Sequence, residues 1–287
     1  MRGGELTTPT EPTQPTQPTQ PTPAGALSPP LTPEAVAAAG SIYLASVVAP
    51  WLAAVRAAIF PAGQIIDPLG ALSATALWAS GIREWLRRAI DPHLLSPYRA
   101  LFPVEGQIIF QQLPYLIRYN SQVRNLLAGV PNEVFGTIRN ITARSVDEGL
   151  SIPNTAALIE QTLLDANAPM WTNRATMVAR TEVRRAQMGG LFGAYTEYSA
   201  RNFMDYIKEW LDSDDNRVRP AHVDTDGQRR QLLQPFAVGV DGGPKFPAMF
   251  PLDPALPANL SIQCRCDMLI EEAGERMTDK SNRGFRR

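Results

Sequence analysis

The longest apolar run of the chain spans Ala35–Val55, where no charged residue occurs. Pro33 suits the first turn of a helix and Thr32 suits its N-cap, so the pattern predicts a helix over residues 33–60. The run is long enough to cross a bilayer. It is rich in alanine, poor in leucine and phenylalanine, and lacks a flanking Lys/Arg cluster. These features favour a buried or oligomer-packing helix, with membrane contact as the lesser alternative.

More helical patterns follow and predict a helical region over residues 32–130, whose role the sequence does not indicate. Ala71–Ile90 predicts one helix with a basic C-terminal end. Gln107–Leu127 is amphipathic and predicts another, which Pro114 should kink or divide. Between them, three prolines are expected to break the chain: Pro92, Pro97 and Pro103.

The helical pattern continues in the central part of the chain. Asn154 is the expected N-cap of a short helix that carries Leu158 and Leu163. A long helix is expected from Trp171 to about Trp210, although three glycines weaken it: Gly189, Gly190 and Gly193. Before these helices, residues at three-to-four spacing define one apolar face: Val134, Ile138 and Ile141, extended by Val146 and Leu150.

Composition changes after Trp210. Residues 211–263 are rich in Asp, Gly and Pro, with short apolar runs such as Phe236–Val238. This pattern predicts loops with two or three short strands, which have little core of their own and pack on the preceding helices. The expected fold is therefore mainly α, with a small loop-rich α+β module at the C-terminal end.

The two ends of the chain differ from the rest. Within residues 1–31, proline recurs every three positions between Thr and Gln or Glu, from Pro9 to Pro21. This period matches polyproline II and predicts a solvated tether, with a ligand for a proline-binding groove as the alternative. Residues 273–287 are polar and basic and are expected to be a disordered tail.

The whole composition excludes several classes of protein. Hydrophobic residues make up 44% of 287 residues, enough for one or two domains with a sizeable core. The net charge of −1 gives no global basic field for nucleic acid or anionic membrane. Only two cysteines occur and no secretory signal is evident, so the chain is expected in a reducing compartment.

Polar residues gather between Trp210 and the turn signal Asp226–Gly227. The cluster consists of Asp214, Asp215, Arg217, Arg219 and His222. We expect His222 to be a structural residue that is hydrogen-bonded to a carboxylate. Upstream, Arg180 and Glu182 lie close together on a helix. Either Glu182 orients Arg217 or Arg219 across the domain, or this is a solvated face with weak ion pairs.

Cys264 and Cys266 offer two thiolates that could bind zinc. With His222 and one aspartate they would complete four ligands, although C-x-C spacing is less common in zinc sites than C-x2-C. Otherwise the cysteines share one face of a strand and pack as small apolar groups. A metal-dependent hydrolase or nuclease built on these residues with Asp214 and Asp215 is the alternative function.

The order of these short motifs resembles the phage Mu F-like head morphogenesis family over about residues 131–270. The resemblance is carried by Ala179-Arg180-Thr181-Glu182, by Trp210, by Arg217-x-Arg219-Pro-x-His222 with Asp226-Gly227-Gln228, by Asp253-Pro254 with Asn259, and by Cys264-x-Cys266. Leu252 and Gln263 stand where the family often has Gly and Asn. The site residues it implies are Arg180, Glu182, Trp210, Asp215, Arg217, Arg219, His222, Asp226, Gly227, Asp253, Cys264 and Cys266.

The resemblance implies a function that the residue patterns alone do not. It implies that residues 131–272 are a Mu F-like domain of a minor head protein, made in the host cytoplasm and present in the virion near the portal vertex. Its partners would be portal and capsid proteins, and its role head assembly and DNA packaging or delivery, with DNA contact left open. No catalytic activity and no cofactor is expected, apart from the zinc considered above.

Overall fold

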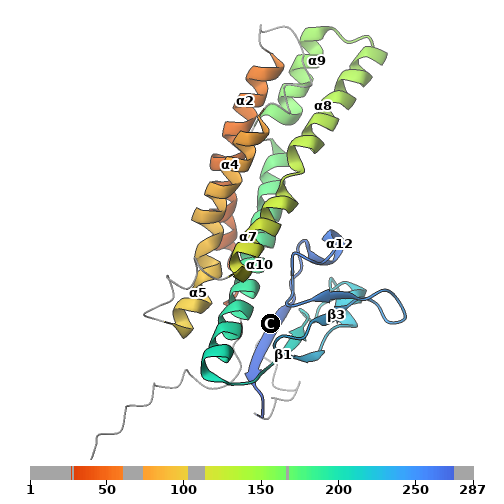
Figure 1. Cartoon of the computed structure of the whole chain (residues 1–287). Helices are drawn as coiled ribbons and strands as arrows, with labels where there is room; N and C mark the ends of the chain where they lie inside the picture. Colours follow the sequence, from red (N-terminus) through yellow and green to blue (C-terminus); the bar gives the residue numbers. More distant parts are fainter. Residues whose placement is uncertain (1–26, 28, 61–73, 103–113, 166–167, 275–287) are drawn as a thin grey trace, which may run out of the picture.

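The chain folds into an elongated helical bundle with a small module beside one end of its longest helix (Figure 1). The computed structural model describes residue 27 and residues 29–60, 74–102, 114–165 and 168–274. The mainly α fold with a small α+β C-terminal module confirms the sequence prediction. The N-terminal tether lies almost wholly outside the described residues, as do residues 275–287 of the tail.

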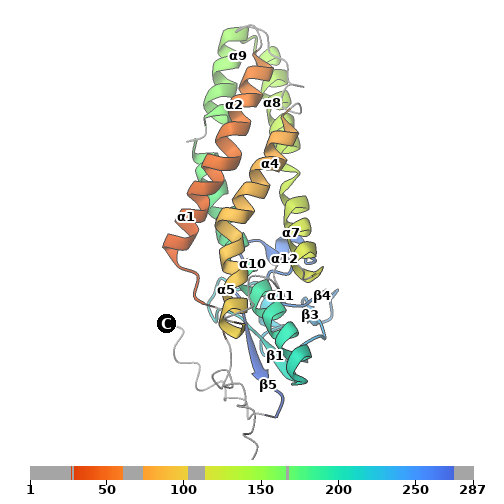
Figure 2. The same cartoon turned by 60° about the vertical axis from the view of Figure 1, so that its left-hand side comes forward.

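The bundle is built from long helices with short π-helical turns between some of them. In chain order the elements are α1 (Pro33–Tyr43), η1 (Leu44–Val48), α2 (Ala49–Ile59), α4 (Thr75–Trp85), η2 (Leu86–Ile90), α5 (Asp91–Leu101), α7 (Pro114–Leu127), α8 (Val130–Asp147), α9 (Ile152–Ile159), η3 (Glu160–Leu164) and α10 (Pro169–Asn202). Figure 2 shows α1 and α2 as one continuous rod beside α4.

The predicted helix over residues 33–60 is confirmed as α1, η1 and α2. Thr32 is its N-cap, and the Thr32 Oγ1 accepts the backbone N–H of Ala35 at 3.2 Å. By length and composition, Pro33–Ile59 is apolar enough to cross a membrane. In the bundle, however, its Trp51, Val55 and Ile59 are fully buried. The apolar side chains of this helix therefore contribute to a protein core.

The expected break at Pro92 and Pro97 is wrong, because the helix continues through both prolines to Leu101. Pro92 follows the π-helical turn η2 and lies in the first turn of α5, where a missing N–H costs little. Pro97 is inside α5 and buried, and α5 packs along α10. Pro103 lies outside the described residues. The described part of α7 begins at Pro114, and residues 107–113 of the predicted helix lie outside the described residues, so the expected kink or division at Pro114 stays a prediction.

The central helices agree with the pattern in their core and differ at their ends. Val134, Ile138 and Ile141 are buried, as their spacing predicts, whereas Leu150 is exposed. The N-cap of α9 is Ser151 and not Asn154: the Ser151 Oγ accepts the Asn154 N–H at 3.3 Å. Local capping chemistry therefore starts α9 three residues earlier than expected.

The predicted end of the long helix near Trp210 is wrong. Helix α10 ends at Asn202, because Phe203 adopts the left-handed conformation with φ of 55°. The chain then turns into strand β1 (Tyr206–Leu211), which contains Trp210. A left-handed C-terminal residue is usually glycine or asparagine, so the sequence carried no signal for this stop.

The C-terminal module contains short strands and helical turns around its own core. The remaining elements are α11 (Pro220–Val223), β2 (Arg229–Gln231), β3 (Phe236–Val238), β4 (Phe246–Ala248), α12 (Ala258–Ser261) and β5 (Asp267–Glu272). Strands β2, β1 and β5 form an antiparallel sheet in that order, with Lys208 opposite Arg230 and Ile270. Strands β3 and β4 form a second antiparallel pair.

Helix α10 belongs to both cores and joins the two parts. Its Trp171 and Ala179 pack in the bundle, whereas Met188 and Phe192 pack in the core of the module. Every residue from 181 to 194 is buried. A helix covered on all sides normally carries apolar residues, so the charged residues in this stretch must be paired within the protein.

Gly190 allows the close approach of α10 and α5, and this leads to a first prediction. A Cβ at Gly190 would overlap the backbone carbonyl of Leu94. We expect Gly190→Ala to lower the free energy of unfolding by about 1–3 kcal/mol, because the two backbones must separate. The control is Gly136→Ala in α8, where a Cβ meets nothing within 4 Å. Denaturant unfolding followed by circular dichroism measures both, and equal effects would contradict the prediction.

Candidate functional site

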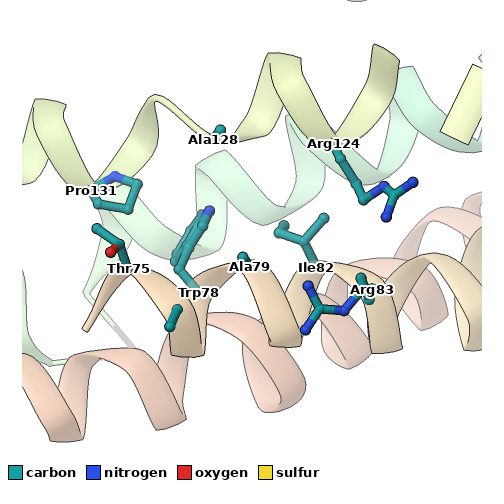
Figure 3. Close-up of a pocket in the computed structure, with 9 residues that line it drawn as sticks. Thr75, Trp78, Ala79, Ile82, Arg83, Arg124, Ala128 and Pro131 are labelled. Carbon is teal, nitrogen blue, oxygen red and sulfur yellow. The ribbon is translucent and has the colours of Figure 1, made fainter. Parts of the chain in front are cut away.

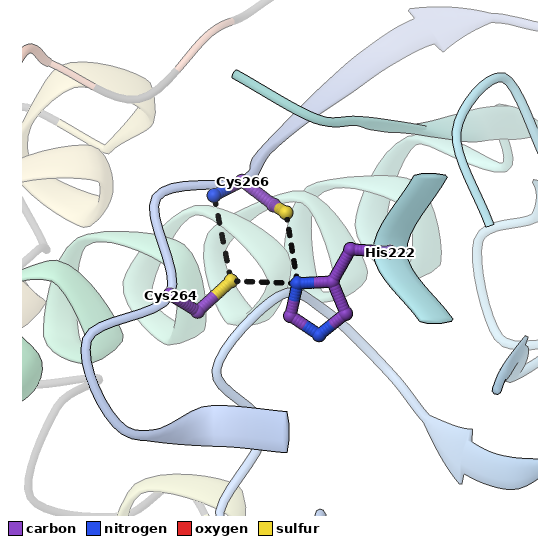
Figure 4. A group of neighbouring side chains, drawn as sticks. All are labelled: His222, Cys264 and Cys266. Atoms are coloured by element: carbon purple, nitrogen blue, oxygen red, sulfur yellow. Dashed lines mark hydrogen bonds between the residues drawn. The ribbon is translucent and has the colours of Figure 1, made fainter. Parts of the chain in front are cut away.

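Three side chains from two distant segments meet inside the C-terminal module: His222, Cys264 and Cys266. Their ligand atoms all lie within 4.8 Å of one another. The His222 Nδ1 is 3.6 Å from the Cys264 Sγ and 3.3 Å from the Cys266 Sγ (Figure 4). The three residues are 1%, 4% and 2% exposed, so the cluster is sealed from solvent.

Local backbone features place these three residues. His222 lies on the single turn α11, which Pro220 begins at a position where its missing N–H costs little. Gln263 adopts φ of 55° just before the cysteines, and its N–H donates to the Thr181 Oγ1 of α10 at 3.1 Å. Cys264 and Cys266 lie in the segment that leads into β5, rather than on a strand as expected. The Trp210 ring packs against His222 with centroids 5.5 Å apart.

The two thiols differ strongly in acidity. The thiol of Cys266 hydrogen-bonds to Cys264 and lowers the pKa of Cys264 well below its usual range, with His222 and the backbone N–H of Cys266 acting in the same direction. The same hydrogen bond, together with burial and the charge on Cys264, raises the pKa of Cys266. The contacts within the cluster therefore lower the pKa of one of its thiols, and a thiolate is the form of cysteine that binds metals.

The expected carboxylate partners of His222 are not in place. The His222 Nδ1 faces the two sulfurs, and its Nε2 is buried without a hydrogen-bond partner in the part of the chain that the structure describes. Among the described residues, no aspartate joins the group of three. Asp214 is exposed in a left-handed conformation with φ of 49°. The predicted structural His–carboxylate bond and the aspartate ligand are therefore both wrong.

Two further interactions hold the same segments together beside this cluster. Arg265, between the cysteines, forms a bidentate ion pair with Asp215, with its Nη2 2.6 Å from the Asp215 Oδ1. The Arg219 guanidinium donates to the backbone carbonyl of Ile262. The hydrogen bond from Arg265, with the backbone N–H of Arg217, lowers the pKa of Asp215 to about 2. The Arg-x-Arg-Pro-x-His motif thus lies against the Cys-Arg-Cys motif.

Asp226 and Gly227 form the turn that the sequence predicts. The Asp226 Oδ1 accepts the Asp212 N–H at 3.0 Å, and Gly227 adopts φ of 72°. The Gly227 N–H donates to the Trp210 carbonyl at 2.9 Å. The next residue, Gln228, accepts the Ala237 N–H at 2.7 Å and so connects the turn to β3. These residues position the backbone around Trp210 rather than bind an external group.

Glu182 pairs with Arg185, one turn further along α10, so the alternative in which it orients Arg217 or Arg219 is wrong. Both side chains are buried, with 5% and 1% exposed, so the solvated-face alternative is also wrong for Glu182. The Arg185 Nε donates to the Leu252 carbonyl at 2.8 Å, which connects α10 to the module. Burial raises the pKa of Glu182, and Arg185 opposes this shift. Arg180 is exposed.

Asp253 organises the loop that Arg185 reaches. Its two carboxylate oxygens accept the N–H groups of Met249 and Ala255 at 2.7 and 2.9 Å. Lys208 of β1 is fully buried beside this loop and donates to the Met249 carbonyl at 2.8 Å. Burial lowers the pKa of Lys208 to about 7, and Asp253 opposes the shift. The Asp253-Pro254 motif is therefore a structural turn element.

Sequence reasoning missed four residues that matter here: Arg184, Arg185, Lys208 and Arg265. Arg184 pairs with Asp267 at the start of β5 and donates to the Pro29 carbonyl. A signal existed for Arg185 and Arg265, since one is at i+3 from Glu182 and the other lies between the cysteines. For Lys208 the sequence contained no such signal, because a lysine on a short strand is usually solvated.

The bundle contains a separate cavity of about 400 Å³ between α4 and the α7–α8 region (Figure 3). Trp78, Ile82 and Pro131 supply apolar walls, and Arg83 and Arg124 lie at one end. Among the described residues that line it there is no histidine, cysteine or carboxylate. This cavity therefore offers apolar surface and two guanidinium groups, and no His–Cys cluster like that of the module.

Comparison with known proteins agrees with the position of these motifs. Residues 136–269 match the family described as Phage Mu protein F like protein. No curated protein and no solved structure matches the chain. The matched range begins within α8, includes all of α10 and ends in β5. It therefore contains the His–Cys cluster, Arg185 and Arg265. The family is one of structural and head-morphogenesis proteins. Residues 136–269 are therefore similar to the Phage Mu protein F like family, and this similarity points to a phage head-related protein.

Proposed function

We propose that the chain is a minor head protein, a structural component of the virion that acts at the portal vertex in head assembly and in DNA packaging or delivery. The observation that carries the proposal is the family match over residues 136–269, together with the path of α10 through both cores. Because α10 is shared, the helices of residues 32–130 are held firmly to the family module. This arrangement suits a protein that docks through one part and is anchored through the other.

The burial of the motif residues supports a structural use of the module. His222, Cys264, Cys266, Glu182 and Asp253 are each less than 9% exposed. Their partners are other parts of the same chain. For example, Glu182 pairs with Arg185, which in turn donates to the Leu252 carbonyl. A nuclease or hydrolase needs its acid–base and metal groups to reach a substrate. The geometry therefore favours interaction over catalysis, and the hydrolase or nuclease remains the alternative that the test must address.

The experiment is co-sedimentation of the full chain with purified portal assemblies and with procapsids that contain or lack the portal. We expect the chain to sediment with the portal and with portal-containing procapsids, and to be depleted from portal-free ones. Equal binding to both kinds of procapsid would contradict the portal-vertex role. Failure to sediment with any of them would contradict the whole proposal.

A DNA cleavage assay with added divalent metals tests the alternative function as a metal-dependent nuclease. The test variant is His222→Ala, and the matched control is His93→Ala, because His93 is the only other histidine and lies in α5 of the bundle. We expect no cleavage by the wild-type protein. Cleavage that is lost in His222→Ala and kept in His93→Ala would replace the structural proposal with the enzymatic one.

A further inference from the structure

We infer that His222, Cys264 and Cys266 bind one zinc ion, which stabilises the C-terminal module by joining two of its segments. This inference is independent of the proposed role at the portal. It rests on the geometry, burial and chemistry of the three side chains. It assigns the zinc three protein ligands and makes the ion a link between α11 and the segment that leads into β5.

The distances fit a tetrahedral zinc site. With zinc–sulfur bonds of about 2.3 Å and zinc–nitrogen bonds of about 2.0 Å, neighbouring ligand atoms lie about 3.6 Å apart for N and S and about 3.8 Å apart for two sulfurs. The His222 Nδ1 lies 3.6 and 3.3 Å from the two Sγ atoms, and all three atoms lie within 4.8 Å. The two nitrogen–sulfur distances are thus within about 0.3 Å of those in a tetrahedral site, and a zinc ion can be placed between the three atoms when the side chains adjust.

The chemistry of the ligands favours zinc over other divalent ions. Two thiolates and one imidazole are soft and borderline ligands, which suit zinc and not magnesium or calcium. Two thiolates and a neutral imidazole also balance the charge of Zn²⁺. A site with no net charge suits a position where the three ligands are 1–4% exposed.

Groups beside the two cysteines are placed as a zinc–thiolate site needs. The backbone N–H of Cys266 donates to the Cys264 Sγ at 3.4 Å, a contact that stabilises a bound thiolate. The Asp215–Arg265 pair fixes the residue between the two cysteines. With Nδ1 bound to zinc, the His222 proton resides on Nε2, the nitrogen that points away from the sulfurs.

The ion would close a long loop of the chain. Cys264 and Cys266 lie 42 and 44 residues after His222. The segment between His222 and Cys264 contains β2, β3 and β4, and none of these strands is longer than three residues. Such short strands have few ladder hydrogen bonds, so a metal that joins α11 to the start of β5 adds a constraint that they lack. Its binding free energy then contributes to folding.

The test is metal analysis of the purified full chain, comparing wild type, Cys264→Ser/Cys266→Ser, His222→Ala and the control His93→Ala. We expect about one zinc per chain in the wild type and in His93→Ala, loss in the double variant and depletion in His222→Ala. Cobalt added to the metal-free wild type should give the thiolate charge-transfer absorption of a tetrahedral Co²⁺ site. Zinc that persists in the double variant would overturn the inference.

A second measurement keeps the test valid where a variant fails to fold. The wild-type protein is treated with a chelator, and its thermal unfolding is followed by tryptophan fluorescence, to which Trp210 beside His222 contributes. We expect the midpoint to fall on metal removal and to return when zinc is added back. A wild-type chain that contains no zinc and takes up none would also overturn the inference. Neither result changes the portal co-sedimentation test.

Discussion

Replacing Glu182 by alanine is expected to lower the free energy of unfolding by about 3–5 kcal/mol, because it leaves the buried Arg185 guanidinium without its counter-charge. Arg185 is 1% exposed and, among the described residues, would keep its bond to the Leu252 carbonyl as its remaining partner. Glu182→Gln should cost less, since the amide oxygen can still accept from Arg185. Equilibrium denaturation with urea measures these differences.

The comparison needs a surface pair and a double variant as controls. Glu84 pairs with Arg87 at 2.8 Å on α4 and η2, with side chains 44% and 68% exposed. Glu84→Ala should change stability by less than about 1 kcal/mol. Replacing both Glu182 and Arg185 by methionine removes both charges at once and should recover much of the loss. A Glu182→Ala effect as small as that of Glu84→Ala would contradict the importance of the buried pair.

The fold was predictable where local pattern and tertiary packing agree. The uncharged run Ala35–Val55 indicated the first helix, and the spacing of Val134, Ile138 and Ile141 indicated a buried face. It was not predictable where packing overrides local preference. The helix continues through Pro97 because α5 packs along α10, and Gly190 is needed there for close approach. The sequence shows the glycine and the proline, but not the neighbour that makes them compatible with a helix.

The candidate site was predictable in its residues but not in its pairings. His222, Cys264 and Cys266 were identified from residue type, and the structure brings them together. The aspartates of the same cluster were expected beside His222, yet Asp215 turns to Arg265. Sequence order cannot say which of several carboxylates faces a given cation, because the pairing depends on how α11 and the Cys-Arg-Cys segment pack.

Two buried basic residues, one from α10 and one from β1, meet at one loop of the module. Arg185 of α10 donates to the Leu252 carbonyl, and Lys208 of β1 donates to the Met249 carbonyl. Asp253 fixes this loop through the Met249 N–H. The longest helix and the central strand are thus hydrogen-bonded to the same turn, so the Asp253-Pro254 motif and the Glu182–Arg185 pair act on one part of the module.

The buried lysine of this arrangement predicts a rise of stability with pH. Burial lowers the pKa of Lys208 to about 7, whereas an unfolded lysine titrates near about 10.4. Between these values the unfolded chain holds a proton that the folded chain has released, so the free energy of unfolding rises with pH. The slope contributed by Lys208 is at most about 1.4 kcal/mol per pH unit. Below pH about 7 Lys208 is protonated in both the folded and the unfolded chain, and its contribution to the free energy of unfolding no longer changes with pH.

Lys208→Met isolates this contribution, because it keeps the apolar stem between Phe192 and Phe236 and removes the ammonium group. In the wild type, the Lys208 Nζ lies 4.8 and 4.9 Å from the centroids of these rings. We expect the rise between pH 7 and 10 in the wild type to be reduced in Lys208→Met and retained in Lys245→Met, whose lysine is at the module surface. Urea unfolding at each pH gives the slopes, and taking the difference between variants removes the tyrosine and cysteine titrations that they share. Parallel curves for the wild type and Lys208→Met would mean that Lys208 stays charged in the folded protein, held by the two rings, the Met249 carbonyl and Asp253.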